Sequence, residues 1–164
     1  MEVNRFNDLV REHTSRLYAL AYRLTSDRHM AEDIVQETFK SVWKTKKEID
    51  KQYEKAWLSV ILRRRYIDMK RARPFPLTSE NLEIEVSDPN YVDNFSRNVQ
   101  DALNKLDEDI KETLLLVVVN GLTHDETARV LQIPLGTVLS RVNRARNQLR
   151  KMLQSQECYA KQSW

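Results

Sequence analysis

The sequence is short of several residue types, and each shortage excludes a class of protein. Among 164 residues there is one cysteine, Cys158, so neither a disulfide framework nor a cysteine-rich zinc cluster can form. Only two glycines and four prolines are present, which favours helices over a β-sandwich or a disordered chain. No apolar run approaches the roughly 18 residues that cross a bilayer. The charged stretch MEVNRFNDLV is unlike a signal peptide. We therefore expect a cytoplasmic, mostly helical protein without membrane insertion.

Charge is distributed unevenly along the chain, although the formal net charge is only +3. Basic and acidic residues balance over residues 1–50. Residues 51–73 hold eight basic against two acidic residues, 74–110 hold two against nine, and 111–164 hold eight against four. Two basic segments around an acidic one indicate two separate contacts with a polyanion, for which nucleic acid is the natural choice. A solvated helix face is the alternative for either basic segment taken alone.

Proline marks the boundary between two helical parts of the chain. Three of the four prolines fall in the stretch PFPLTSENLEIEVSDPN, which begins at residue 74. Helical periodicity stops before this stretch and returns from about Val99, as is typical around a linker. We predict an all-α fold with two small helical domains joined by a flexible acidic linker. The predicted order is a three-to-four-helix bundle over 1–73, the linker over 74–98, a C-terminal domain over 99–155 and a tail over 156–164.

The N-terminal domain has three stretches with apolar residues at three- and four-residue steps, the spacing of one helix face. The first runs from Phe6 to Leu24 and the second from Ala31 to Val42, with the capping sequence TSD between them. The third follows the polar segment KTKKEIDKQ. Its residues predicted to face inward are Tyr53, Trp57, Val60, Ile61 and Ile67.

The run ETLLLVVV, residues 112–119, would suit a strand if taken alone, because β-branched residues favour strands. Its flanks favour a helix instead. Several Asp and Glu residues lie at its start, where Asp107 can act as the N-cap. At its end Asn120-Gly121 can adopt the left-handed conformation of a helix C-cap. We predict a fully buried helix, preceded by a short helix with Val99, Ala102, Leu103 and Leu106 on its apolar face.

The capping residues and apolar spacing of residues 122–152 predict a helix-turn-helix. Thr123 and Glu126 have the spacing of a capping box, and Leu122 is placed as a hydrophobic staple. A short helix should run from about residue 124 to 131, and only residues 132–134 remain for the turn. The second helix must begin directly after this turn, because its apolar stripe already starts at residue 138. The stripe consists of Val138, Val142, Ala145, Leu149 and Met152. Two helices joined by so short a turn form a helix-turn-helix.

The second helix of this motif is basic on its outward face, which presents Thr137, Ser140, Arg141, Arg144 and Arg146, with Arg150 and Lys151 further on. Arginine reads guanine edges and clamps phosphates, so the helix is predicted to enter the major groove of DNA. Gly136 lies in its first turn. There the missing side chain permits close approach of a DNA phosphate to helix amides, or it relieves crowding within the helix pair.

Together these residues resemble the extracytoplasmic-function sigma factors, the small two-domain promoter-recognition subunits of bacterial RNA polymerase. The resemblance covers nearly the whole chain and rests on three motifs in the family's order. The stretch MAEDIVQETFKSVW (30–43) is similar to the polymerase-binding helix, and AWLSVILRRRYIDMKRAR (56–73) is similar to the −10 element helix. The third, GLTHDETARVLQIPLGTVLSRVNRARNQL (121–149), is similar to the −35-reading helix-turn-helix. The resemblance implies a factor that binds core polymerase, reads both elements and helps melt DNA.

The first motif carries a polar stripe opposite its apolar one, made by Asp33, Gln36, Glu37 and Lys40. The resemblance implies that this stripe binds core RNA polymerase at the coiled coil of the β′ subunit, with the β subunit as a further contact. A solvated face is the alternative. An acid–base pair of Glu32 and Asp33 is disfavoured, because adjacent helix positions diverge by about 100°.

The resemblance assigns DNA contacts to both basic segments. Phosphate contacts in the second motif are expected from Arg63, Arg64, Arg65, Lys70, Arg71 and Arg73. Trp57 and Tyr66 are able to stack on an unpaired base, although Trp57 fits the core better. The −35 contacts are expected from Gly136, Thr137, Leu139, Ser140, Arg141, Asn143, Arg144 and Arg146.

Three positions depart from the family's usual pattern. Arg64 stands where Asn is usual, and Gln132 stands where Gly or Asn is usual in the corner. Leu139 stands where Lys or Arg is common. These departures predict a different −35 sequence or less phosphate contact, and Leu139 is able to touch a thymine methyl group instead.

The resemblance also implies a partner and a path for the linker. In the family an anti-sigma protein covers both domains, and the acidic linker threads through the basic RNA channel of the polymerase. A solvated tether is the alternative for the linker.

Two other functions fit parts of the sequence. A helix-turn-helix regulator would act on duplex DNA without the core enzyme, and a polymerase-binding adaptor would contact no bases. We expect no enzyme, cofactor or metal site, because the three histidines, His13, His29 and His124, are scattered and no carboxylate or cysteine cluster has catalytic spacing.

Overall fold

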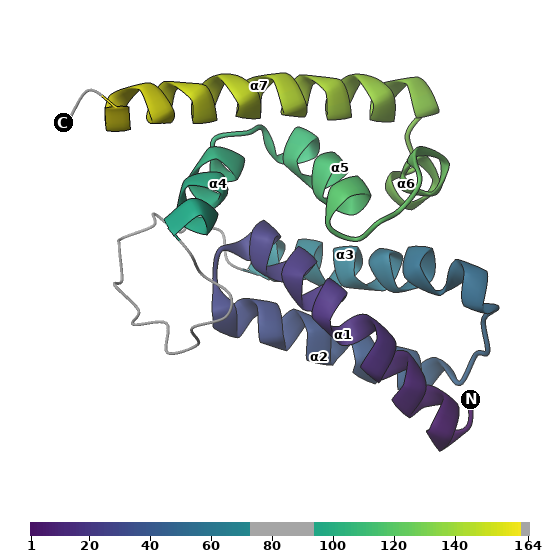
Figure 1. Ribbon diagram of the computed structural model, residues 1–164. Coiled ribbons are helices and arrows are strands. Elements are labelled where there is room, and N and C mark those ends of the chain that lie inside the picture. The colour runs from purple at the N-terminus through teal and green to yellow at the C-terminus, as the bar shows by residue number, and fades with distance from the viewer. Residues whose placement is uncertain (73–93, 162–164) are drawn as a thin grey trace.

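The computed structural model describes residues 1–72 and 94–161, and all regular structure in these ranges is helical. The predicted all-α fold is therefore confirmed. The N-terminal unit contains α1 (Val3–Thr25), α2 (Arg28–Thr45), the 3₁₀ helix η1 (Lys51–Tyr53) and α3 (Glu54–Ala72). The C-terminal unit contains α4 (Asn94–Asn104), α5 (Glu108–Val118), α6 (His124–Leu131) and α7 (Leu135–Lys161) (Figure 1). Most of the predicted linker, residues 74–93, lies outside the described residues.

None of the helices in the described ranges has a segment long and apolar enough to cross a membrane.

Two of the predicted domain boundaries can be compared with the ends of helices. Helix α4 begins at Asn94, inside the predicted linker, and α7 continues to Lys161, inside the predicted tail.

The turn between α1 and α2 has the residues that such a turn requires. Ser26 adopts the left-handed conformation, with φ of 55°, and its N–H donates to the Tyr22 carbonyl at 2.8 Å. The side chain of Asp27 accepts from the Met30 N–H at 2.9 Å, which caps α2. The predicted break at 25–27 is therefore confirmed.

The predicted apolar stripes of α1 and α2 form the core of the N-terminal unit. Leu17, Leu20 and Ala21 of α1 are at most 1% exposed, and Ala31 and Val42 of α2 are fully buried. These stripes were predictable because each of the two helices buries a single face.

The predicted inward face of the third helix is wrong at two of its five residues, Tyr53 and Val60. Tyr53 and Val60 are 51% and 46% exposed, whereas Leu58, Leu62 and Tyr66 are buried. Helix α3 packs on α1 and α2 and also contacts α6 of the C-terminal unit. Apolar residues therefore occupy more than one side of α3, and their periodicity does not identify one buried face. Partly buried residues are Trp57, Ile61 and Ile67.

A buried carboxylate that the sequence pattern did not reveal fixes the start of α3 against α1. Glu54 is 1% exposed and is paired with Arg5. Its second oxygen lies 3.1 Å from Nε2 of His13, which is itself 3% exposed. Buried carboxylates are stable only when paired in this way.

Replacing Glu54 by glutamine is expected to lower the free energy of unfolding by roughly 1–2 kcal/mol, because the buried partners lose a charged acceptor. Chemical denaturation measures this change. The control is Glu48→Gln, which removes an exposed carboxylate of the same unit that forms no ion pair among the described residues and should leave stability nearly unchanged. Equal effects of the two substitutions would contradict a structural role for Glu54.

The helix predicted over residues 112–119 is present as α5, and its end has the predicted signal. Gly121 follows with φ of +71°, a conformation that glycine adopts without strain. Residues 114–116 are buried, but Val118 is 58% exposed. The prediction that this helix is fully buried is therefore wrong at its C-terminal end.

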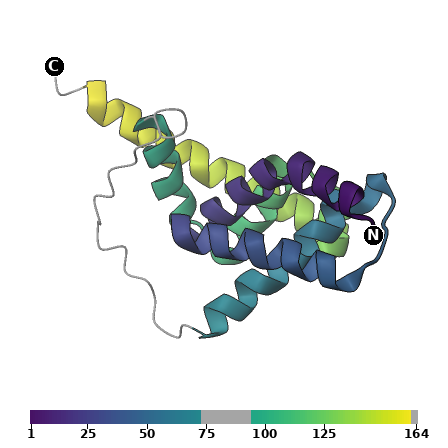
Figure 2. The ribbon, with the colours of Figure 1, turned by 90° about the horizontal axis from the view of Figure 1, so that it is seen from below.

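The two units pack directly on each other. Helix α5 contacts α1, α6 contacts α3, and both contact α7 (Figure 1). Helices α5 and α6 therefore lie between α7 and the N-terminal unit, and α7 extends beyond the helices packed on it (Figure 2). Polar bonds cross this boundary: the Gln100 side chain donates to the Arg23 carbonyl at 3.1 Å, and the Asn120 amide donates to the Ser59 hydroxyl.

Candidate nucleic-acid interface

The corner between α6 and α7 is built by local hydrogen bonds. The Thr123 hydroxyl accepts from the Glu126 N–H at 3.1 Å, and the Glu126 carboxylate accepts from the Thr123 N–H at 2.7 Å. The predicted capping box is thus confirmed, and Leu122 before it is buried. Gln132 ends α6 in the left-handed conformation, with φ of 56°. The remaining turn residues lead at once into α7, as a helix-turn-helix requires.

Gly136 lies in the first turn of α7 and is exposed. Apart from its chain neighbours and the nearby backbone of α7, no atom of the described residues would lie within 4 Å of a Cβ at this residue. Relief of crowding within the helix pair therefore does not explain this glycine. The open space adjoins the N-terminal amides of a helix, which favour an anion such as a phosphate group.

The predicted −35 residues lie on one side of α7, opposite its buried stripe. Val138, Val142 and Ala145 of that stripe are at most 3% exposed. Exposed residues of the predicted set are Gly136, Leu139, Ser140, Asn143, Arg144 and Arg146, and partly exposed ones are Thr137 and Arg141. Because this face is polar and basic at the start of a long helix, it has the form of a major-groove reading surface.

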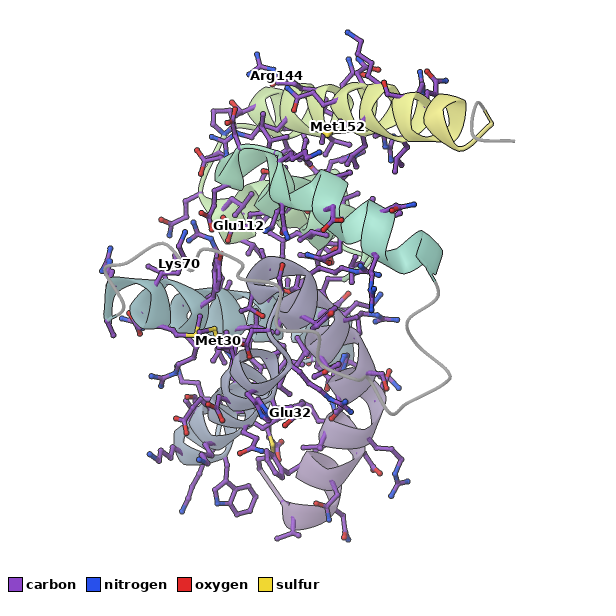
Figure 3. The ribbon with its side chains drawn as sticks, turned by 90° about the vertical axis from the view of Figure 1, so that its left-hand side faces the viewer. Met30, Glu32, Lys70, Glu112, Arg144 and Met152 are labelled. Atoms are coloured by element: carbon purple, nitrogen blue, oxygen red, sulfur yellow. The ribbon has the colours of Figure 1, made fainter. Side chains whose placement is uncertain are left out.

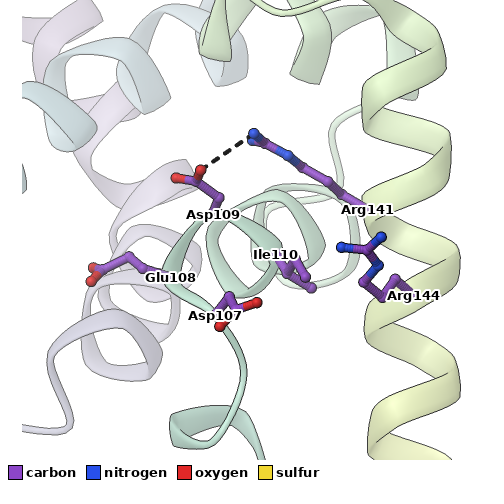
Figure 4. A pocket seen from close by; sticks show the side chains of 6 residues that line it. All are labelled: Asp107, Glu108, Asp109, Ile110, Arg141 and Arg144. Atoms are coloured by element: carbon purple, nitrogen blue, oxygen red, sulfur yellow. Dashed lines mark hydrogen bonds and ion pairs between the residues drawn. The ribbon is translucent and has the colours of Figure 1, made fainter.

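Two arginines on this face differ in their partners. Arg141 donates to the Asp109 carboxylate at 3.3 Å, and its side chain is 26% exposed. Arg144 lies one turn further along and forms no ion pair or hydrogen bond within residues 1–72 and 94–161. Both line an open pocket between the start of α5 and α7 (Figure 4). The guanidinium group of Arg144 is therefore unpaired among the described residues, whereas that of Arg141 is held by Asp109.

The five predicted −10 residues of α3 divide into occupied and free groups. Arg63 donates to Glu112 of α5 at 2.8 Å, and Lys70 is paired with Glu108. Arg65 donates to the Ser41 hydroxyl of α2 at 2.7 Å. Arg64 and Arg71 are exposed and form no ion pair or side-chain hydrogen bond among the described residues. Arg73 lies outside the described residues.

Tyr66 does not occupy the position that base stacking requires. It is 6% exposed, and its hydroxyl donates to Glu108. Burial, together with this carboxylate, raises the pKa of the Tyr66 hydroxyl well above its ordinary value. Trp57 is partly buried against the core. Neither ring is presented as a stacking surface in this arrangement.

The polar stripe of α2 lies on the surface, as predicted. Asp33, Gln36, Glu37 and Lys40 are exposed. Lys40 donates to Glu37 at 2.7 Å, and this hydrogen bond lowers the pKa of the Glu37 carboxyl. The stripe therefore offers carboxylate and amide acceptors on one side of a rigid helix, a suitable surface for a basic protein partner.

One group of side chains has the spacing of metal ligands. Donor atoms of Glu12, His13 and Glu54 lie within 4.8 Å of one another. Their charges are already balanced, because Arg5 pairs with Glu54 and Lys51 pairs with Glu12 at 3.3 Å. Two cations beside three ligands do not suit a metal ion, so this group is better explained as the structural network at the start of α3.

Comparisons with known proteins match both units to separate parts of one family. The family model described as Sigma-70 region 2 matches residues 9–74, and the model described as Sigma-70, region 4 matches residues 96–149. The chain is 34% identical over 157 residues to the ECF RNA polymerase sigma factor SigE of Mycolicibacterium smegmatis. This match covers 90% of the chain but only 61% of SigE, so the chain spans less than two thirds of that relative.

Other relatives match over most of their length. ECF RNA polymerase sigma factor SigW of Bacillus subtilis is 28% identical, with 90% of this chain and 88% of SigW covered. SigK of Mycobacterium tuberculosis is 30% identical, with 87% of this chain and 82% of SigK covered.

Two solved structures have a similar arrangement. One is the sigma factor RpoE of Bartonella quintana in complex with the anti-sigma factor NepR, with a TM-score of 0.79 and 28% identity over 93% of this chain and 98% of that one. The other is CnrH in complex with the cytosolic domain of CnrY, with a TM-score of 0.72 and 26% identity over 94% of this chain and 90% of that one.

Proposed function

The chain belongs to the ECF sigma factors of RNA polymerase, and from this premise we propose that it directs core polymerase to promoters and helps open the duplex. The observation that carries the proposal is the order of its parts. The part of the chain that matches region 2 comes first, and it contains an exposed polar helix and a basic helix. The part that matches region 4 follows, and it contains a helix-turn-helix with a capping box. A sigma factor needs all of these in one chain, because it must hold polymerase and two DNA elements together.

The α2 stripe is proposed to bind core polymerase. Its acceptors, Asp33, Gln36 and Glu37, are spaced along one exposed face, which fits a basic segment such as the coiled coil of the β′ subunit. The β subunit is the further contact that the family resemblance suggests. Charge complementarity of this kind sets the orientation and specificity of a complex more than its affinity.

The two basic helices are proposed to bind the two promoter elements. Arg64 and Arg71 of α3 are free for phosphates near the −10 element. The exposed face of α7, with Arg144 at its centre and Gly136 at its start, is proposed to read the −35 element.

An anti-sigma protein is the third proposed partner. The similar RpoE structure contains the anti-sigma factor NepR, and the similar CnrH structure contains part of CnrY. Because this chain resembles both over more than nine tenths of its length, a protein that contacts both units is proposed to hold it inactive.

Selection from a random DNA library tests the proposal against its rivals. The chain alone and the chain with core polymerase are each used to select DNA. A sigma factor with core enzyme enriches two elements at a fixed spacing. Enrichment of a single element by the chain alone would favour a helix-turn-helix regulator. Polymerase binding without any enrichment would favour an adaptor, and either result would contradict the proposal.

Replacing Arg64 by glutamine is expected to reduce the salt dependence of DNA binding, because one phosphate contact is lost. The slope of log K against log salt should become shallower by about 0.9. Titrations of labelled promoter DNA with the core-bound chain at several salt concentrations measure this slope. Arg65→Gln is the comparison, and it should change the slope less because Ser41 already holds that guanidinium group. If the slope is unchanged in Arg64→Gln, Arg64 does not contact a DNA phosphate group.

A further inference from the structure

Two exposed leucines lie at the start of the proposed −35 helix. Leu135 and Leu139 of α7 are 41% and 47% exposed. They are four residues apart, so their side chains are neighbours on the helix surface, separated by about 6 Å along its axis. A single exposed leucine is common on a protein surface. A pair of them on the first turns of a helix that is proposed to enter the major groove requires a specific explanation.

The other residues at the start of α7 offer little side chain to a partner. Within the segment 135–141 the exposed residues are Leu135, Gly136, Leu139 and Ser140. Gly136 has no side chain, and the Ser140 hydroxyl donates to the Thr137 carbonyl at 3.0 Å. Arg141 is partly exposed, but its guanidinium group pairs with Asp109. The two leucines are therefore the only exposed side chains of this segment that are longer than that of serine.

Local hydrogen bonds fix the backbone that carries the two leucines. The Ile133 N–H donates to the Ala128 carbonyl at 3.1 Å, which closes the corner after α6. The N–H groups of Thr137 and Val138 donate to the Pro134 carbonyl at 3.0 and 3.2 Å, and the Val138 side chain is fully buried. Because this helix start is already ordered, binding through the leucines does not require a loop to become ordered.

The chemistry of the major groove identifies a partner for an apolar pair. Base edges there present hydrogen-bond donors and acceptors, and the one apolar group among them is the C5-methyl group of thymine. A leucine placed against any other base edge would bury polar atoms without a hydrogen-bond partner, which is unfavourable. Thymine methyl groups are therefore the feature of duplex DNA that this pair fits.

The leucines are also continuous with polar residues that suit base edges. The exposed Asn143 lies one turn beyond Leu139 in the same row of the helix, and the exposed Arg144 follows it. Asparagine pairs with adenine and arginine with guanine in the major groove. Arg144 lies in the C-terminal unit on the side away from α1, α2 and α3 (Figure 3). This continuity favours DNA over an apolar protein segment as the partner of the leucines.

We propose that Leu135 and Leu139 contact thymine methyl groups in the −35 element and set its base preference at two positions. Base pairs are about 3.4 Å apart along the duplex, so a separation of about 6 Å along the helix places the two thymines no more than two base pairs apart, on either strand. This inference rests on the proposed function for the identity of the DNA. It adds which bases the element contains and which side chains select them.

Deoxyuridine in place of thymidine tests the contact, because uracil lacks only the C5-methyl group and forms the same base pair. Duplexes are first selected from a random library by the full chain, alone and bound to core polymerase. Each thymidine of the selected −35 element is then replaced singly, and affinity is measured by competition. Two replacements should each weaken binding by about fourfold, the effect expected for one buried methyl group.

Alanine variants assign each methyl group to its leucine. Leu139→Ala should bind the thymine and uracil duplexes equally well at one of the two positions and keep the uracil effect at the other. Leu135→Ala should give the reverse result. Both side chains are exposed, so neither substitution removes core packing. The control is Val118→Ala, which shortens a 58% exposed apolar side chain of α5 in the same unit and should keep both uracil effects.

A change of specificity gives a second, independent measurement. Leu139→Lys places an ammonium group where the parent chain has an apolar one, and lysine pairs with the guanine O6 and N7 atoms. Selection with this variant should enrich guanine in place of one thymine and leave the other thymine unchanged. Continued enrichment of both thymines by Leu139→Lys would contradict the assignment of Leu139.

The outcomes separate this inference from the proposed function. A selected element without two thymines at this spacing, or uracil effects that persist in both alanine variants, would overturn the inference even if the chain directs initiation. Weaker binding of core enzyme by the alanine variants, with the uracil effects intact, would assign the leucines to a protein contact and would also overturn it.

Uracil effects that each alanine variant removes as expected would support the inference even if core enzyme failed to initiate with the chain. That failure would count against the proposed function alone. Selection of no DNA, either by the chain alone or with core enzyme, would overturn both.

Discussion

Replacing Asp33 by arginine is expected to weaken binding of core polymerase on the order of 100-fold, or about 2.7 kcal/mol. Asp33 is exposed on the α2 stripe, and the proposed partner surface is basic. An arginine there would place like charges against each other, and such a juxtaposition costs several kcal/mol. Affinity of the labelled chain for purified core enzyme, measured by fluorescence anisotropy, gives the change directly.

A matched substitution separates docking from general charge effects. Asp8→Arg makes the same charge change at an exposed carboxylate of α1 in the same unit, and it should alter core affinity little. Binding of the Asp33→Arg chain to duplex DNA in the absence of core enzyme should not weaken. Equal loss of core binding in both variants, or parallel loss of DNA binding, would contradict the role proposed for the stripe.

Replacing Arg144 by alanine is expected to relax discrimination at the −35 element by about 1–3 kcal/mol, the value of one bidentate contact to a base edge. Arg144 is exposed on α7 and has no partner among the described residues, so it is free to read a base without first breaking an ion pair. Competition between the selected promoter and single-base variants of its −35 element, with core enzyme present, measures the discrimination.

Arg150→Ala is the comparison on the same helix. Arg150 is exposed but lies further from the corner, beyond the N-terminal turns that enter the groove in a helix-turn-helix. It should lower affinity equally for all the variants and leave their order unchanged. If Arg144→Ala also left the order unchanged, Arg144 would not be a reader of bases.

Local features were predictable from the sequence because neighbouring residues determine them. The Thr123–Glu126 capping box and the left-handed Gly121 depend on residues a few positions apart, and both are present. The family suggested by three motifs is likewise confirmed by matches to both sigma-70 regions. The apolar stripes of α1 and α2 were predictable because each helix buries one face.

Contacts between residues distant in the sequence were not predictable. Tyr53 and Val60 were wrongly predicted to face inward, because α3 is covered by α1, α2 and α6 on more than one of its sides and no single periodicity describes its buried residues. Glu54 was missed because a carboxylate inside an apolar face carries no signal until Arg5 and His13 are brought beside it. The pairing of Glu108 and Glu112 of α5 with Lys70 and Arg63 of α3 was not predictable either, since these partners lie 38 and 49 residues apart in the sequence.

Start-site mapping of transcripts made by purified core enzyme tests the central claim most directly. Core enzyme with this chain, on a template carrying the selected promoter, should give a run-off transcript from one defined position, and loss of either promoter element should abolish it. Core enzyme alone should give no such product. If the chain binds core enzyme yet no template in the selected pool yields a defined start, it does not act as a sigma factor.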